Sequence, residues 1–212
     1  MRHSSLLLLA TILTTLGCAR RAIPTTDVAD SLARATAAHR TEYKQAHLDS
    51  EHGPLRTQAQ VDRLRFYPAD AAYRVQARFI PSPTDGALLT LALSSGTTRQ
   101  YRAYGTLDFE VAGRSAQLIV YQSPNPQQSP PQYRDYLFLP FNDLTNGDGT
   151  YGGGRYLDLR TGDIEGGKVI LDFNKAYNPY CAYADGYACP IPPAPNRLDI
   201  AILAGEKDYD VH

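Results

Sequence analysis

The stretch YRVQARF, residues 73–79, decides the fold class of this chain, because apolar and polar side chains alternate in it without a break. Tyr, Val, Ala and Phe occupy the odd positions, and Arg, Gln and Arg occupy the even ones. A period of two is that of a β-strand with one face in a core and the other toward solvent. An amphipathic helix would need a period of about 3.6 residues. The stretch therefore predicts a half-buried strand.

Similar runs follow at spacings that suit an antiparallel meander. Further strands are predicted at residues 88–93, 99–104, 107–111, 116–121, 134–141, 156–159, 169–173 and 198–203. Gly105-Thr106 and Ala112-Gly113 are turn signals, and the Pro- and Gln-rich residues 123–132 predict an exposed loop. The pattern predicts a mainly β fold, a single antiparallel β-sandwich or barrel-like domain.

One α-helix is predicted before the β-rich part. Residues 26–50 are rich in helix formers, and Val28, Leu32 and Tyr43 fall near one weakly apolar face. Gly53-Pro54 ends this helix. We expect the helix to lie on the surface of the domain or to link it to the N-terminus. The predicted organisation is a linker and helix at residues 19–53 and a β-rich domain at residues 54–212.

The first 18 residues have the pattern of a secretion signal. Arg2 and His3 precede an uncharged apolar run over residues 6–17. The run is shorter than the roughly 20 apolar residues of a transmembrane helix, so a residual membrane anchor is the lesser alternative. The stretch TLGC at residues 15–18 resembles a bacterial lipobox, with Thr15 where leucine is usual. We therefore predict a lipid-modified Cys18, and secretion without a lipid is the alternative.

A lipid on Cys18 would tether the mature chain to a membrane, because each buried methylene contributes about 0.8 kcal/mol. Ala19 follows the cysteine, where aspartate would resemble an inner-membrane retention signal. The expected location is thus the bacterial cell envelope, lipid-anchored, with the outer membrane favoured. The expected partners are this membrane and an envelope ligand or protein that the sequence does not identify.

The two remaining cysteines, Cys181 and Cys189, lie in the stretch NPYCAYADGYACPIPP. An even pair in an oxidising compartment predicts a disulfide. A zinc site or a reactive thiol is the alternative. Zinc usually needs four ligands, and neither histidine nor a further cysteine is near in sequence. The disulfide would stiffen a loop rich in tyrosine and proline.

Charge and histidine content exclude several functional classes. The chain has 21 Lys and Arg against 22 Asp and Glu, so no basic surface for nucleic acid is predicted. Residues 54–211 contain no histidine, whereas His39, His47 and His52 belong to the predicted helix and its end. Ser-His-Asp and Cys-His mechanisms, haem and most zinc or copper sites are excluded, unless the helix folds over the site. No cofactor is predicted.

Three stretches look like the bacterial family known only as domain of unknown function 1684. They are LFLPFNDLTNGDGTYGGGRYLDL at residues 137–159, LDFNKAYNPYCAYADGYACPIPPAPN at residues 171–196, and AGEKDY at residues 204–209. Residues 63–79 are similar to the approach to that family's first strands. The family has no established activity, substrate or cofactor, so the resemblance implies no residue role. Many longer members have an additional N-terminal β-region, whereas here a lipobox and one helix precede the domain.

Carboxylates are the candidate catalytic groups, because Asp143, Asp158, Asp172 and Glu206 lie in or beside these stretches. Two carboxyl groups about 5 to 9 Å apart could catalyse glycoside hydrolysis. The alternative is that the aspartates cap turns. Residues 143–149 faintly resemble a calcium loop but lack its alternating ligands and distal glutamate, so we predict a hairpin and no metal.

The candidate ligand-binding residues are Arg155, Asn174, Tyr177 and Asn178. Arg155 follows three glycines, where its guanidinium could grip a carboxylate, or could pair within the fold with Asp172 or Glu206. The other three belong to a cluster of tyrosine and amide groups that is typical of sugar or peptide sites, or that satisfies loop backbone.

The leading functional hypothesis is a non-catalytic module that binds a ligand or partner. The alternative is a carboxylate-dependent hydrolase of envelope glycans or esters that uses two of Asp143, Asp172 and Glu206.

Overall fold

The structure is a computed structural model in which residues 25–83 and 86–209 are described. Its helices and strands are α1 (Thr25–Asp49), α2 (Gln58–Asp62), β1 (Arg74–Pro81), β2 (Leu88–Ala92), β3 (Thr98–Val111), β4 (Arg114–Gln122), β5 (Tyr136–Phe141), β6 (Arg155–Arg160) and β7 (Lys168–Asp172). The predicted mainly β fold with one preceding helix is confirmed. The predicted signal and Cys18 lie outside the described residues.

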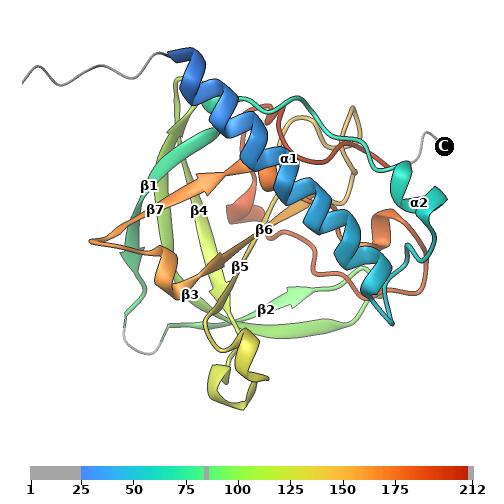
Figure 1. Cartoon of the computed structure of the whole chain (residues 1–212). Helices are drawn as coiled ribbons and strands as arrows, with labels where there is room; N and C mark the ends of the chain where they lie inside the picture. The colour runs from blue at the N-terminus through green and yellow to red at the C-terminus, as the bar shows by residue number, and fades with distance from the viewer. Residues whose placement is uncertain (1–24, 84–85, 210–212) are drawn as a thin grey trace, which may run out of the picture.

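The strands form one curled antiparallel sheet rather than two packed sheets (Figure 1). Seven strands take part among the described residues, in the order β6-β5-β4-β3-β1-β7, with β2 paired to β3. The half-barrel leaves β6 and β7 as its two end strands. Figure 1 shows α1 lying across the sheet at these strands.

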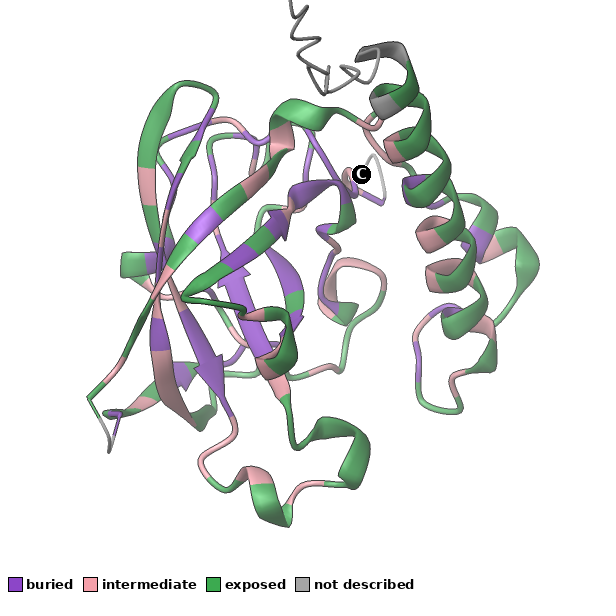
Figure 2. Cartoon of the chain, turned by 60° about the vertical axis from the view of Figure 1, so that its left-hand side comes forward, coloured by how far each residue is buried: buried purple, intermediate pink, exposed green. Residues whose placement is uncertain are grey.

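The main core lies on one face of the curled sheet. On β5, Leu137, Leu139 and Phe141 are buried in this core, whereas Tyr136 and Phe138 alternate with them and project from the other face. Figure 2 shows buried residues along the strands, while α1 is mostly exposed or half-buried. The helix is therefore an outer layer and not part of the main core.

The sheet corrects one predicted turn. β3 runs unbroken through Gly105-Thr106, and the strand register shifts there between Ala103 and Gly105. A Cβ on Gly105 would lie 2.3 Å from Cε2 of Phe79, so this glycine permits a close strand-to-side-chain approach at a bulge. The turn predicted at Ala112-Gly113 is confirmed between β3 and β4.

The strand predicted at residues 198–203 is wrong, although its alternate apolar side chains do enter the core. Its backbone pairs only briefly with the residues after β5, where the N–H of Leu198 donates to the carbonyl of Asn142 at 2.8 Å and the N–H of Leu144 donates to that of Ile200 at 3.2 Å. At Ile202 the partners are two buried side chains. The N–H of Ile202 donates to Asp143 Oδ1 at 3.2 Å, and Nη2 of Arg155 donates to the Ile202 carbonyl at 2.9 Å. The charged pair thus satisfies the backbone of Ile202, and the short pairing at Leu198 and Ile200 does not continue as a strand.

Of the two alternatives for Arg155, the one in which its guanidinium is exposed to a partner is contradicted by the structure. Its side chain is 0 % exposed and lies 2.8 Å from the carboxylate of Asp143. The alternation of β6 explains the burial, because Arg155 shares the core face with Leu157 and Leu159. The alternative, pairing within the fold, holds with Asp143 and not with the side chain of Asp172 or Glu206. From Glu206, Arg155 receives a contact to the backbone carbonyl alone.

The predicted disulfide between Cys181 and Cys189 is confirmed. It closes a loop whose two flanks pair with the sheet, Tyr177 with Tyr156 on β6 and Pro190 with Leu93, which directly follows β2. The segment is therefore held on the sheet from both sides. None of the helices within residues 25–83 and 86–209 has the length and apolar content to cross a membrane.

Gly205 allows the C-terminal segment to pass close to the loop after β7. It has a φ of +77°, and a Cβ there would lie 2.7 Å from the carbonyl oxygens of Phe173 and Ala176. Gly166 is a matched control, because its φ of +55° is also left-handed but its Cβ would meet nothing within 4 Å.

We expect Gly205→Ala to lower the free energy of unfolding by roughly 2 kcal/mol more than Gly166→Ala does. Both variants carry left-handed strain, but only the first adds a clash with backbone. Urea denaturation of the two variants measures the difference. Equal losses would contradict the close approach at Gly205.

Candidate functional site

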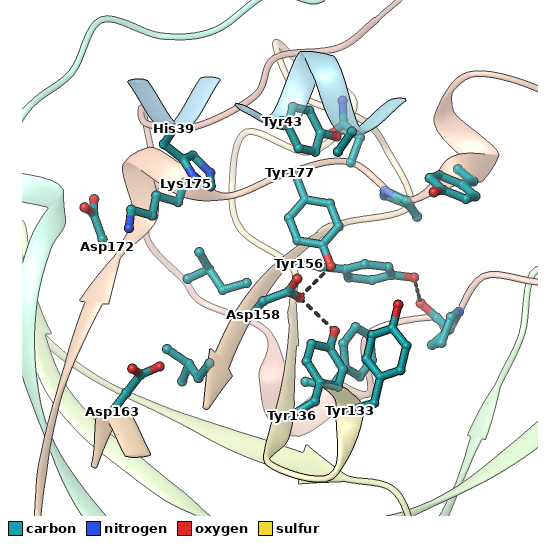
Figure 3. A pocket seen from close by; sticks show the side chains of 18 of the residues that line it. His39, Tyr43, Tyr133, Tyr136, Tyr156, Asp158, Asp163, Asp172, Lys175 and Tyr177 are labelled. Carbon is teal, nitrogen blue, oxygen red and sulfur yellow. Dashed lines mark hydrogen bonds between the residues drawn. The ribbon is translucent and has the colours of Figure 1, made fainter. Parts of the chain in front are cut away.

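A pocket of about 1180 Å³ lies between α1 and the end strands of the sheet (Figure 3). One face of α1 lines it, together with residues from β5, β6 and β7 and from the disulfide-closed loop. Tyr136 and Phe138 of β5 and Tyr156 and Asp158 of β6 line the pocket from the face of these strands opposite the main core. Leu157 and Leu159 of β6 also contact it.

The second half of α1 is docked by a few specific contacts. Nη2 of Arg40 donates to the carbonyl of Tyr67 at 2.7 Å, and its guanidinium lies 4.8 Å from the ring centroid of Phe66. The Tyr43 hydroxyl lies 2.8 Å from that of Tyr183 and donates to Glu206 at 3.1 Å. These contacts hold α1 over the pocket instead of leaving it as a free spacer.

The position of α1 brings histidine to the site. His39 and His47 both line the pocket. The exclusion of imidazole chemistry from the β-rich part therefore does not apply, because the helix does fold over the site. Burial lowers the pKa of both imidazoles below the ordinary 6.5, and the charge of Lys175 lowers that of His39 further. Both rings are neutral at pH 7.

Asp158 occupies the centre of the pocket and is held by two tyrosines. Its Oδ1 accepts the hydroxyl of Tyr136 at 2.7 Å and that of Tyr177 at 2.6 Å (Figure 3). Tyr136 comes from the neighbouring strand. Tyr177 is placed by backbone pairing with Tyr156 on the free edge of β6, with N–H to O distances of 2.9 and 3.0 Å. The carboxylate is therefore fixed by three separate segments.

The carboxyl group of Asp158 is surrounded by protein yet open to solvent through the pocket. Burial raises its pKa above the ordinary value of 3.8, while the two phenol hydrogen bonds and the positive charge of Arg160 oppose the increase. Burial together with the Asp158 charge raises the pKa of Tyr136 and Tyr177. Both hydroxyls stay protonated and donate.

Aromatic rings form a continuous wall beside Asp158. The Phe138 ring stacks on Tyr101 at a centroid distance of 5.6 Å and meets Tyr156 edge-on at 4.7 Å. Tyr156 in turn meets Tyr177 edge-on at 5.8 Å. Such pairs fix ring positions and present an apolar surface with polar hydroxyls at its rim.

Charged groups of both signs lie around this wall. The cationic lining residues are Arg74, Arg99 and Lys175, and the anionic ones are Asp158, Asp163, Glu165 and Asp172. With both histidines neutral, the pocket lining carries a net charge of −1. Within the described ranges, no group of three or more His, Cys, Asp or Glu side chains is arranged to hold a metal ion.

Asp143, Asp172 and Glu206, the carboxylates predicted for catalysis, each bind other groups of the fold. None of them is hydrogen-bonded to another of the three. Asp143 pairs with Arg155 and accepts the N–H of Thr145 at 2.8 Å. Asp172 accepts the N–H of Asn174 at 3.2 Å, in a turn at the end of β7. The hydrogen bonds from the N–H groups of Thr145 and Asn174 are turn caps, which is the alternative role predicted for these aspartates.

Glu206 is buried below α1, outside the pocket lining. Its carboxyl accepts the N–H of Asn178 at 2.9 Å and the hydroxyls of Tyr183 at 2.8 Å and Tyr43 at 3.1 Å. Burial raises its pKa from 4.5 to about 7, and these hydrogen bonds oppose the increase. Glu206 thus joins α1 to the C-terminal segment.

Tyr177 is the predicted ligand-binding residue that presents a functional group in the pocket, through its hydroxyl on Asp158. Asn178 also lines the pocket, but it is 1 % exposed and its Nδ2 donates to the carbonyl of Lys207. Asn174 is buried, and its Nδ2 donates to the carbonyl of Asp70 at 2.9 Å. Arg155 belongs to the core.

Sequence reasoning named Asp158 among four carboxylates but did not select it. One signal could have done so. In the strand RYLDLR at residues 155–160, Asp158 alternates with the core leucines and shares a face with Tyr156. No sequence signal indicated that α1 would cover the pocket, because the apolar stripe of this helix is weak.

A family model described as a protein of unknown function, DUF1684, matches residues 59–207. The solution NMR structure of an uncharacterised protein from Haloarcula marismortui is similar, with a TM-score of 0.66 and 30 % sequence identity. The match covers 89 % of this chain and 100 % of that one. No curated protein matches this chain.

The burial of Glu206 predicts a pH-dependent stability. The folded chain retains the Glu206 proton up to about pH 7, whereas the unfolded chain releases it near 4.5, so stability is lost as the pH rises between these values. We expect the stability of wild type relative to Glu206→Gln to fall by about 3 kcal/mol across this range.

Chemical denaturation of both proteins between pH 4 and pH 8 measures this difference in stability. The two histidines titrate in both proteins, so their contribution cancels in the difference. Glu110→Gln, which removes an exposed carboxylate on β3, is the control for the substitution itself. A wild-type to Glu206→Gln difference that does not change with pH would contradict the prediction.

Proposed function

The chain belongs to the DUF1684 family of proteins of unknown function, and we propose that it is a ligand-binding protein whose site is the pocket beneath α1. The observation that carries the proposal is Asp158. Its carboxylate is fixed by two tyrosine hydroxyls, yet it is open to the interior of a large pocket. Ligand sites characteristically combine such a pocket with a few well-placed polar groups.

Binding is favoured over hydrolysis by the arrangement of the acidic groups. The hydrolase hypothesis required two of Asp143, Asp172 and Glu206 to face each other in a cleft. Asp143 is instead neutralised by Arg155, and Glu206 is enclosed by hydroxyls outside the pocket lining. Asp158, with its oriented hydroxyl donors, is suited to hold a ligand in one position.

We further propose that the protein works in the bacterial cell envelope, tethered by a lipid on Cys18. The sequence before the first helix supports this, with its apolar run and lipobox-like TLGC. α1 begins at Thr25, seven residues after Cys18. Seven residues span at most about 25 Å, so the pocket beneath α1 would lie close to the membrane surface.

Filling the pocket from α1 tests the binding proposal. Ala35 lines the pocket, whereas Ala37 is exposed on the same helix outside the lining. We expect Ala35→Trp to reduce the increase in melting temperature caused by a pocket ligand, because the indole takes up part of the pocket. Ala37→Trp should preserve that increase.

The measurement is a thermal shift assay of the full chain in detergent with a defined panel of monosaccharides, disaccharides, amino acids, dipeptides and choline. Both tryptophan variants should melt within a few degrees of wild type without ligand. If Ala35→Trp responds to every stabilising compound as wild type does, the site lies elsewhere.

The lipid tether has its own test. Cells that express the chain are labelled with an alkyne-bearing palmitate, and the purified protein is examined for incorporated label. We expect wild type and Cys181→Ser to carry the label and Cys18→Ser to lack it, because only the thiol of Cys18 would receive the lipid. Label retained by Cys18→Ser, or absent from wild type, would contradict the proposal.

A further inference from the structure

We propose that the pocket binds an uncharged carbohydrate, with ring hydroxyls on Asp158 and an apolar ring face on the tyrosine wall. This inference deepens the proposed function and rests on it. Three properties of the pocket support it, namely the balance of its charges, the open hydrogen-bonding capacity at its centre, and the aromatic surface beside that centre.

The balance of charge favours an uncharged ligand. The pocket lining carries three cationic and four anionic side chains, so neither sign dominates. An organic cation near Asp158 would meet repulsion from Lys175 and Arg99. An anion would meet repulsion from Asp158 and Asp163. In this partly desolvated space, electrostatic repulsion from groups of like sign would therefore cancel much of the attraction that a charged ligand gains from groups of opposite sign.

Asp158 keeps capacity for a ligand hydroxyl. Its Oδ1 accepts two phenol hydroxyls, while its Oδ2 accepts no hydrogen bond from any described residue. A carboxylate oxygen in this state is a strong acceptor for an incoming O–H group. Figure 3 shows His39 and Lys175 on the α1 side of Asp158, so donors and acceptors are interspersed. Hydroxyl groups, which donate and accept, match such a mixture.

The aromatic wall supplies the apolar contact. Tyr136, Tyr156 and Tyr177 surround Asp158 (Figure 3). Tyr133 extends the wall outward, since its ring centroid lies 6.1 Å from that of Tyr136 and the residue is 51 % exposed. A sugar ring offers C–H groups on its faces and hydroxyls around its edge. Rings with hydroxyls at their rims complement both features. The volume of about 1180 Å³ accommodates more than one sugar unit.

The test is isothermal titration calorimetry of the full chain with maltose, cellobiose and N,N′-diacetylchitobiose, and with choline and a dipeptide for comparison, in a detergent without a sugar or choline headgroup. We expect at least one of these disaccharides to bind. Asp158→Asn should weaken that binding about tenfold, because a charge-assisted hydrogen bond becomes a neutral one. Asp199→Asn, which removes an exposed carboxylate outside the pocket lining, is the matched control and should bind as wild type does.

Tyr133→Ala provides a second variant that removes an exposed ring without disturbing the core. We expect it to weaken disaccharide binding about fivefold. Melting temperatures of all variants confirm that they are folded. Because Asn still offers an oxygen to Tyr136 and Tyr177, Asp158→Asn should retain its fold.

The outcomes separate the ligand class from the proposed function. Disaccharide binding that both pocket variants weaken supports the inference. Binding of choline or a dipeptide alone, weakened by Asp158→Asn, would overturn the carbohydrate class and leave a ligand-binding pocket. Disaccharide binding that is unchanged in Asp158→Asn and Tyr133→Ala would place the sugar elsewhere and overturn the inference. No binding of any probe would overturn both.

Discussion

The buried pair of Arg155 and Asp143 is the interaction on which the rest of the structure depends. A guanidinium taken out of water is unfavourable by several kcal/mol unless it is paired and hydrogen-bonded. Here its donors reach the carboxylate of Asp143 and the backbone carbonyls of Ile202, Ala204 and Glu206. The side chain of Arg155 thus joins β6, an end strand of the half-barrel, to the turn after β5 and to the C-terminal segment.

The site is built outward from that pair. Once the C-terminal segment is fixed, Glu206 receives the N–H of Asn178 and the hydroxyl of Tyr43, which holds both a loop and α1. The same loop pairs Tyr177 with β6 and thereby places its hydroxyl on Asp158. A residue buried in the core therefore determines, through backbone contacts, where the carboxylate of the pocket finds its donors.

The helix that forms one wall of the pocket is held less completely than the sheet. Five buried side-chain atoms of the described residues have no hydrogen-bond partner, and three of them belong to α1, namely Nε of Arg40 and both ring nitrogens of His47. The other two are Nε of Arg155 and Oδ1 of Asn178. Each such atom is unfavourable by about 1 to 3 kcal/mol. The docking of α1 consequently rests on a small number of contacts, those of Arg40 and Tyr43 foremost. The wall nearest the proposed lipid tether is also the one least strongly bound.

The sequence by itself determined the leading helix, most of the strands and the disulfide, because alternation, helix formers and turn residues act over a few neighbouring residues. It could not predict that Gly105 marks a bulge or which groups pair with Arg155, since each depends on contacts with other segments of the chain. The alternation within residues 155–160 puts Asp158 on the face opposite the core, yet only the tertiary structure brought Tyr136, Tyr177 and α1 to it. Local patterns specify strands, but the curling of the sheet and the docking of a weakly apolar helix decide which strand faces enclose a pocket.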